Sequence, residues 1–236
     1  MTRSNPKSLA LRGFYDGTPF VLVVVPFALL FGVVATEAGL NVAETMGMSI
    51  LVIAGAAQFA ALQQMVADTP LVMILITALA VNLRMAMYSA SLTPWLGKAP
   101  LWKRAVAAYL MVDQSYMLGH AKFEREPDLT LSQRLSYYFG IMTLIAPVWY
   151  AASYVGALAG KAIPPEFALD FAVPITFLAM IAPMVKSLAH LAAAVTSVVL
   201  ALLFAGLPYG TGLLVAAACA MAVGAGVEVA MGRRAP

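Results

Sequence analysis

The sequence predicts an all-α polytopic membrane protein, with about seven or eight transmembrane or re-entrant helices and at least one broken helix. Of its 236 residues, 62% are hydrophobic and 11% are charged, whereas a soluble globular domain carries about 25% charged residues. The mean hydropathy is +0.89. These values exclude an ordinary cytosolic enzyme, a nucleic-acid-binding domain and a disordered protein. The single cysteine, Cys219, excludes a disulfide framework and a cysteine-based metal centre.

The spans follow from the distances between successive charges, because a helix needs about 20 apolar residues to cross a hydrocarbon core of roughly 30 Å. Asp16 and Glu37 bound the first charge-free stretch, and Glu44 and Asp68 bound the second. The turn signal at 206–210 divides the last long apolar stretch into two. The predicted spans lie near 18–37, 46–67, 70–92, 105–121, 135–159, 171–185, 188–205 and 211–229.

Helices are the predicted element because these stretches are apolar on every face, whereas the strands of a membrane barrel alternate with a polar lumen face. The element near 171–185 is the shortest, so it is the least able to cross fully. The connections are short, and we expect one integral membrane domain over 1–236. Arg3, Lys7 and Arg12 precede the first span, which predicts a cytoplasmic N-terminus. Arg233 and Arg234 predict that the C-terminus lies on the same, cytoplasmic side.

Two charges fall inside predicted spans, where an ionisable residue usually faces a cavity or a partner. Arg84 lies nine residues before Thr93, where a polar loop begins, and Asp113 lies nine residues after Arg104, where that loop ends. At 1.5 Å per residue both lie about 13 Å from the same surface. Sequential helices pack antiparallel, so Arg84 and Asp113 can form an ion pair or flank a polar cavity. The alternative is a buried pair that only fixes helix packing.

Polar side chains accompany both charges. Asn82 and Arg84 are two residues apart and cannot share one face of a regular helix, which predicts a local unwinding near Asn82. Unwound segments of transporters offer free backbone groups to ionic substrates. Gln58 follows small residues in the second span, where the alternative is an interhelical hydrogen bond. The predicted substrate-binding residues are Arg84, Asp113, Asn82, Gln58, Gln114, Tyr88, Ser89 and Tyr116.

Four stretches, in this order and spacing, resemble the AzlC family of branched-chain amino acid permease large subunits, which includes exporters of the YgaZ type. They are GFYDGTPFVLVVVPFALLFGVVATEAGL, MSILVIAGAAQF, NLRMAMYSASLTPWL and LMVDQSYML, and they cover roughly the first half of the chain. The Asn-x-Arg with the following Tyr-Ser-x-Ser-Leu-x-Pro is the most specific part. Similar proteins often carry His where this chain has Met85 and Glu where it has Gln114, and these differences bear on substrate and proton coupling.

The resemblance implies export of branched-chain or other hydrophobic amino acids across a bacterial cytoplasmic membrane, with a small AzlD-type membrane subunit as partner. We expect protons or the membrane potential to drive the export. Arg84 and the backbone near Asn82 would hold the substrate carboxylate, and Asp113 with Gln114 would face the ammonium or carry a proton. Gln58 and Tyr88 would complete the hydrogen bonds. The residues expected to form the apolar wall are Phe59, Met85 and Tyr116.

Other functions remain open as alternatives. The chain could be a permease or channel for another small organic solute, or a structural subunit in which both charges only bind a partner. A metal substrate is disfavoured because His120, His190 and Cys219 lack ligand spacing. An intramembrane enzyme is disfavoured because the sequence has no HExxH or GxSxG motif and no paired catalytic carboxylates. No cofactor is expected.

Overall fold

The computed structural model describes residues 6–160, 185, 187–208 and 211–232. Within these ranges the chain forms α-helices and one 3-10 turn, with no strand, which confirms the all-α prediction. The predicted element near 171–185 lies outside the described residues except for Val185, so its crossing stays a prediction. The basic residues at the chain ends that predict the orientation, Arg3, Arg233 and Arg234, lie outside as well.

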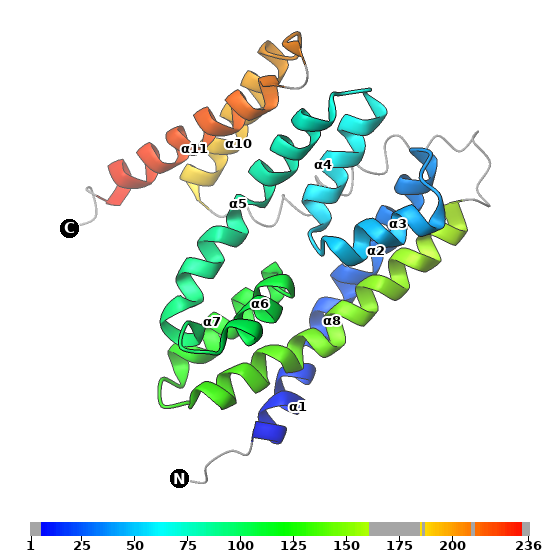
Figure 1. Ribbon diagram of the computed structural model, residues 1–236. Helices are drawn as coiled ribbons and strands as arrows, with labels where there is room; N and C mark the ends of the chain where they lie inside the picture. The colour runs from blue at the N-terminus through cyan, green and yellow to red at the C-terminus, as the bar shows by residue number, and fades with distance from the viewer. Residues whose placement is uncertain (1–5, 161–184, 186, 209–210, 233–236) are drawn as a thin grey trace. The chain divides into compact units, whose positions relative to one another are not determined.

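From α1 to α8 the helices follow one another with short connections (Figure 1). They are α1 (Pro6–Gly17), η1 (Thr18–Phe20), α2 (Val21–Glu37), α3 (Val42–Leu51), α4 (Gly55–Val66), α5 (Leu71–Leu96), α6 (Leu101–Tyr109), α7 (Asp113–Arg125), α8 (Leu131–Gly160), α10 (Leu188–Leu203) and α11 (Thr211–Gly232).

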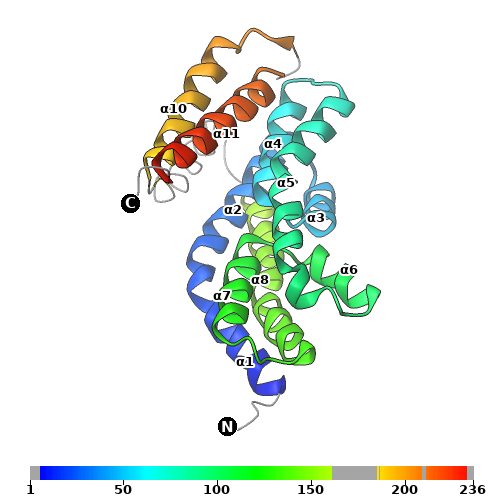
Figure 2. The ribbon, with the colours of Figure 1, turned by 90° about the vertical axis from the view of Figure 1, so that its left-hand side faces the viewer.

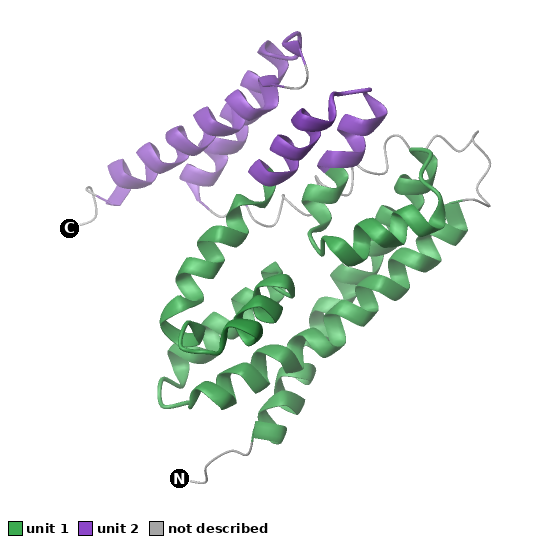
Figure 3. Cartoon of the chain, viewed as in Figure 1, with its two compact units in different colours: residues 1–59, 81–167 green, residues 60–80, 168–236 purple. Residues whose placement is uncertain are grey.

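The chain divides into two compact units (Figure 3). Unit 1 is formed from residues 1–59 and 81–167, and unit 2 from 60–80 and 168–236. In unit 2, α10 and α11 pack against each other as a helical hairpin, and Gly224 brings the α11 backbone close to the Ala193 side chain. Unit 1 contains both charges that the sequence places inside spans.

The packed centre of unit 1 is the contact of α1 and α2 with α8, along which they run in both ribbon views (Figures 1 and 2). Glycines allow the close approach. A Cβ atom at Gly32 would overlap the carbonyl oxygen of Ser153, and one at Gly156 would overlap that of Leu29. Small residues at such positions let membrane helices pack backbone to backbone. The α2–α8 contact is therefore tightly packed, and we call the packed helices α1, α2 and α8 the scaffold.

Four helical segments among the described residues are long and apolar enough to cross a membrane. They are Pro6–Glu37, in which α1, η1 and α2 continue one another, and Leu71–Leu96, Leu131–Gly160 and Thr211–Gly232. The shorter apolar helices α3 and α10 fall below that length.

The unwinding predicted near Asn82 is wrong, because α5 is continuous from Leu71 to Leu96. This stretch is rich in Leu, Met and Ala, which favour helix, and its internal Pro94 lies in the last turn. Asn82 and Arg84 therefore point to different sides of a regular helix, and both are half-buried.

The breaks lie elsewhere. Where the sequence predicts a span near 46–67, the backbone leaves the helix between Leu51 and Gly55, and where it predicts one near 105–121, the backbone leaves it between Tyr109 and Asp113. Val52 and Val112 have extended backbones (φ −137° and −135°). A β-branched side chain fits extended backbone better than helix. Whether each helix pair crosses the membrane stays a prediction.

Candidate functional site

Of the two arrangements expected for Arg84 and Asp113, an ion pair or two groups flanking a polar cavity, the structure has the ion pair. Nη1 of Arg84 donates to Oδ2 of Asp113 at 2.9 Å, which joins the middle of α5 to the start of α7. The two side chains are 33% and 43% exposed. Nε of Arg84 and Oδ1 of Asp113 are buried atoms with no hydrogen-bond partner among the described residues. The pair therefore keeps one unused donor and one unused acceptor.

Asp113 is the first residue of α7, directly after the helix break. A carboxylate is stabilised there by the N–H groups and the dipole at a helix N-terminus, by about 0.3–1 kcal/mol near a surface. Ser115 fixes this turn, because its hydroxyl accepts from the backbone N–H of Val112 at 3.0 Å. The Ser115 hydroxyl also lies 3.2 Å from that of Tyr138, which donates to the carbonyl of Ala107 at 2.9 Å. Tyr138 of α8 thus contacts α6 before the break and α7 after it.

Tyr88 and Tyr116, both predicted site residues, stack face to face next to the ion pair. Their ring centroids are 4.0 Å apart and the planes differ by 7°. The hydroxyl of Tyr116 lies within hydrogen-bond distance, 3.2 Å, of the Ser91 hydroxyl. Two turns of α5 and the first turn of α7 are therefore joined by an ion pair, a ring stack and a hydrogen bond.

The other predicted site residues are placed differently. Asn82 is half-buried, and its Oδ1 has no hydrogen-bond partner in the described part of the chain. Gln114 is half-buried beside Asp113, and within the described ranges its side chain makes no hydrogen bond. Ser89 is exposed and lines a cavity of about 620 Å³ between α5 and α6, which reaches Arg104 and Met111. Nothing in the described contacts joins Gln58 to the Arg84–Asp113 pair.

Gln58 lies at the first break, one turn into α4. Next to it, Phe59 contacts the rings of Phe27 and Phe31, with centroid distances of 5.0 and 5.8 Å. Trp149 of α8 lies 6.0 and 6.2 Å from the same two rings. We call Phe27, Phe31, Phe59 and Trp149 the aromatic cluster. The predicted wall residue Phe59 belongs to this cluster rather than to the surroundings of Arg84.

Tyr109 connects the two breaks, and sequence reasoning missed it. Its hydroxyl donates to the carbonyl oxygen of Ile50, in the last turn of α3, and lies 3.0 Å from the hydroxyl of Tyr150 on α8. Ile50 precedes the first break and Tyr109 precedes the second. The only sequence signal was a tyrosine inside an apolar helix, which usually needs a partner for its hydroxyl.

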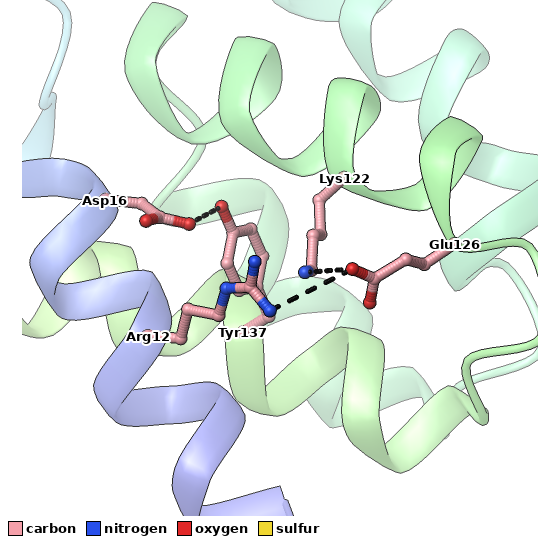
Figure 4. A network of polar contacts seen from close by, with 5 residues as sticks. All are labelled: Arg12, Asp16, Lys122, Glu126 and Tyr137. Atoms are coloured by element: carbon pink, nitrogen blue, oxygen red, sulfur yellow. Dashed lines mark hydrogen bonds and ion pairs between the residues drawn. The ribbon is translucent and has the colours of Figure 1, made fainter. Parts of the chain in front are cut away.

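A second polar cluster joins α1, α7 and α8 (Figure 4). The Lys122 side chain is 7% exposed, and its Nζ lies 2.6 Å from Oε1 of Glu126. The same Oε1 lies 4.0 Å from Nη1 of Arg12. The Tyr137 hydroxyl donates to Oδ2 of Asp16 at 2.7 Å. These five residues line a cavity of about 440 Å³. Two cations share one carboxylate here, so the cluster ties the end of α7 to the scaffold.

A family model described as "AzlC protein" matches residues 19–163. The inner membrane protein YgaZ of Escherichia coli K12 is 26% identical over 179 residues, which are 72% of this chain and 71% of that protein. A membrane protein of Archaeoglobus fulgidus is 28% identical over 82% of this chain and 83% of its own length. A membrane protein of Helicobacter pylori 26695 is 27% identical over 64% and 66%. No solved structure matches the chain. Both broken segments and the Arg84–Asp113 pair lie inside the matched range.

Proposed function

The chain belongs to the AzlC family of multi-pass membrane proteins, and on this premise we propose that it is a secondary transporter subunit that exports branched-chain or other hydrophobic amino acids. The observation that carries the proposal is the half-exposed Arg84–Asp113 pair at the start of α7. A charge in a membrane segment is expensive unless it faces a partner or a water-filled cavity.

The pair offers the two charges that a zwitterion needs. In the proposed cycle the substrate ammonium replaces Arg84 at Asp113, and the substrate carboxylate takes the guanidinium that is released. A partly exposed ion pair contributes only about 0–1 kcal/mol, whereas breaking a fully buried pair costs about 3–5 kcal/mol. The exposure of Arg84 and Asp113 supports a pair that a substrate opens at little cost.

The neighbouring groups have supporting roles in this proposal. The stacked rings of Tyr88 and Tyr116 hold α5 and α7 at a fixed spacing, so that both charges meet the substrate together. Gln114 and Ser89 are proposed as polar contacts along the path, and the cavity between α5 and α6 that Ser89 lines is the proposed route to the pair. The substrate side chain would follow the apolar lining of that cavity.

A small AzlD-type membrane subunit is the proposed partner, in a bacterial cytoplasmic membrane with both chain ends in the cytoplasm. Helix α5 supports a partner, because only 6% of its apolar 18-residue window is buried in the part of the chain that the structure describes. A proton gradient or the membrane potential is the proposed driving force, with Asp113 as the group that would carry a proton.

The test is efflux of labelled valine from proteoliposomes, with and without a pH gradient and with and without the small subunit. Asp113→Asn keeps the size of the side chain and removes its charge, so it should abolish efflux while the protein stays folded. Asp128→Asn, the same change in the exposed α7–α8 loop, is the matched control and should transport normally. Normal efflux by Asp113→Asn removes Asp113 from the mechanism, and failure of valine to compete for binding favours a different small organic solute.

A further inference from the structure

The first turn of α4 has more buried polar groups than partners for them. Gln58 is 1% exposed, and both its amide oxygen and its amide nitrogen have no hydrogen-bond partner among the described residues. The first intrahelical hydrogen bond runs from the N–H of Gln58 to the carbonyl of Ala54 at 3.1 Å. The N–H groups of Gly55, Ala56 and Ala57 precede that bond, so the helix itself provides no acceptor for them.

The Gln58 side chain lies over this turn, because side chains in a helix tilt toward its N-terminus. Helix α8 adds two more buried polar groups. Trp149 Nε1 and Ser153 Oγ are buried, and neither has a hydrogen-bond partner within the described ranges. Trp149 and Ser153 are four residues apart, on one face of α8. A Cβ atom at Gly55 would overlap the Phe27 ring and would approach Cη2 of Trp149, so the rings of Phe27 and Trp149 meet the start of α4.

Such an arrangement is costly unless something binds to it. A buried donor or acceptor without a partner costs about 1–3 kcal/mol, and a membrane interior provides no water to compensate. The groups at the start of α4 are mainly donors: the amide NH2 of Gln58 and the N–H groups of the first helical turn. No cationic side chain is among them, and the dipole of α4 adds a partial positive charge. Such a set matches a carboxylate.

The aromatic cluster gives the site its second property. The rings of Phe27 and Trp149 lie against Gly55 at the start of α4, and the rings of Phe31 and Phe59 contact them at the distances given above. A ligand whose carboxylate lies at the α4 N-terminus would place its other end against these rings. The ligand class is therefore a small carboxylate with an apolar body.

We infer that the start of α4 is a second binding subsite, which holds the carboxylate of the substrate at Gln58 and the N–H groups of residues 55–57. The inference rests on the proposed function, because it takes an apolar amino acid as the ligand. The Tyr109–Ile50 hydrogen bond joins the ends of α3 and α6, the helices that precede the two breaks. In this inference the subsite and the Arg84–Asp113 pair act on the substrate one after the other, without a direct contact between them. Arg84 and Asp113 bind both charged groups of the substrate, whereas the α4 subsite binds the carboxylate alone.

The experiment measures binding of labelled valine to the full chain in lipid nanodiscs, in competition with 3-methylbutanoate, which lacks the ammonium, and isobutylamine, which lacks the carboxylate. Gln58→Leu should weaken competition by 3-methylbutanoate about 10- to 100-fold, as expected for the loss of hydrogen bonds to a charged group. Competition by isobutylamine should stay the same. Asp113→Asn should weaken competition by isobutylamine and leave competition by 3-methylbutanoate unchanged. Gln63→Leu, the same change at an exposed position of α4, should alter neither.

A folding defect is separable from a binding defect. A leucine side chain suits the apolar surroundings of this position, so the thermal unfolding temperature of Gln58→Leu without ligand should equal or exceed that of the wild type. Gln58→Glu is the second variant, because a like charge at this position should repel the carboxylate and weaken valine binding.

Two results overturn the inference: 3-methylbutanoate that fails to compete in the wild type, or competes equally well in Gln58→Leu. If either occurs while Asp113→Asn still abolishes efflux, the α4 subsite is wrong and the proposed function stands. If valine does not bind the wild type but 3-methylbutanoate binding is lost in Gln58→Leu, the subsite stands and the amino-acid substrate is wrong.

Discussion

Helices α8 and α5 are both long enough to cross a membrane, yet they are used in opposite ways. Half of the most hydrophobic window of α8 is buried against other helices, compared with 6% for α5. Helix α8 achieves this through backbone contacts at glycines such as Gly156, whereas α5 contacts its neighbour α7 through Arg84, Tyr88 and Ser91. The comparison indicates that close packing is concentrated on α8, whereas α5 carries the charged residue of the proposed substrate site.

The largest effect should come from breaking the scaffold. In Gly156→Leu the new side chain has no space beside the Leu29 carbonyl, and overpacking costs about 1–3 kcal/mol and more where backbone is in the way. The monodisperse folded fraction in gel filtration should fall severely. Gly47→Leu is the control, because a Cβ at Gly47 of α3 meets no atom within 4 Å. Equal folded yields for both variants would contradict a tightly closed α2–α8 contact.

Replacement of the α5 guanidinium should have a large effect on transport and a small one on stability. Arg84→Lys keeps the charge but loses the planar fork that binds a carboxylate at two points, so valine affinity should fall about 10-fold. The unfolding temperature should stay within a few degrees of the wild type, since an exposed ion pair adds about 0–1 kcal/mol. Arg125→Lys on exposed α7 surface is the matched change. A loss of folding equal to that of Gly156→Leu would place Arg84 in the scaffold.

A smaller effect is expected at Tyr109, which joins the end of α6 to α3 and to α8. Tyr109→Phe removes the hydroxyl that joins the end of α6 to Ile50 and to Tyr150 of α8. We expect valine efflux to slow by about 5- to 10-fold, because one hydrogen bond contributes about 0.5–1.5 kcal/mol. Tyr154→Phe, at an exposed position of α8, is the control. An unchanged efflux rate in Tyr109→Phe would mean that the two breaks work independently.

The smallest effect should come from Ser91→Ala, which removes the hydrogen-bonding partner of the Tyr116 hydroxyl. The Tyr88–Tyr116 ring stack and the ion pair remain, so efflux should change by less than about 5-fold. A complete loss of efflux would show that the α5–α7 spacing depends on this one contact, rather than on the ion pair and the stack.

Sequence reasoning predicted the Arg84–Asp113 pair because helix geometry fixes depth: equal distances from a shared loop bring two residues to one level. It placed the backbone break wrongly, at Asn82, because it treated the spacing of Asn82 and Arg84 as a conflict within one helix. A regular helix accommodates both when each is half-buried, as Asn82 and Arg84 are.

The two helix breaks have only weak signals in the sequence. Neither Val52–Ala54 nor Leu110–Val112 contains Pro or Gly, and extended backbone there is fixed by tertiary contacts such as the Ser115–Tyr138 hydrogen bond. Tyr109, Trp149 and Ser153 were missed for a related reason. In an apolar sequence, the hydrogen-bond partners of such side chains come from helices that are distant in the chain. The spacing of apolar residues within one helix does not predict these contacts.

The central claim is that the Arg84–Asp113 pair acts on the substrate and does not merely hold α5 to α7. The double variant Arg84→Met with Asp113→Leu tests it most directly, because apolar replacement of an ion pair is often neutral or stabilising for the fold. Efflux of labelled valine should be lost in this variant while its unfolding temperature equals or exceeds that of the wild type. Efflux at the wild-type rate would contradict the claim and leave the pair as a packing contact.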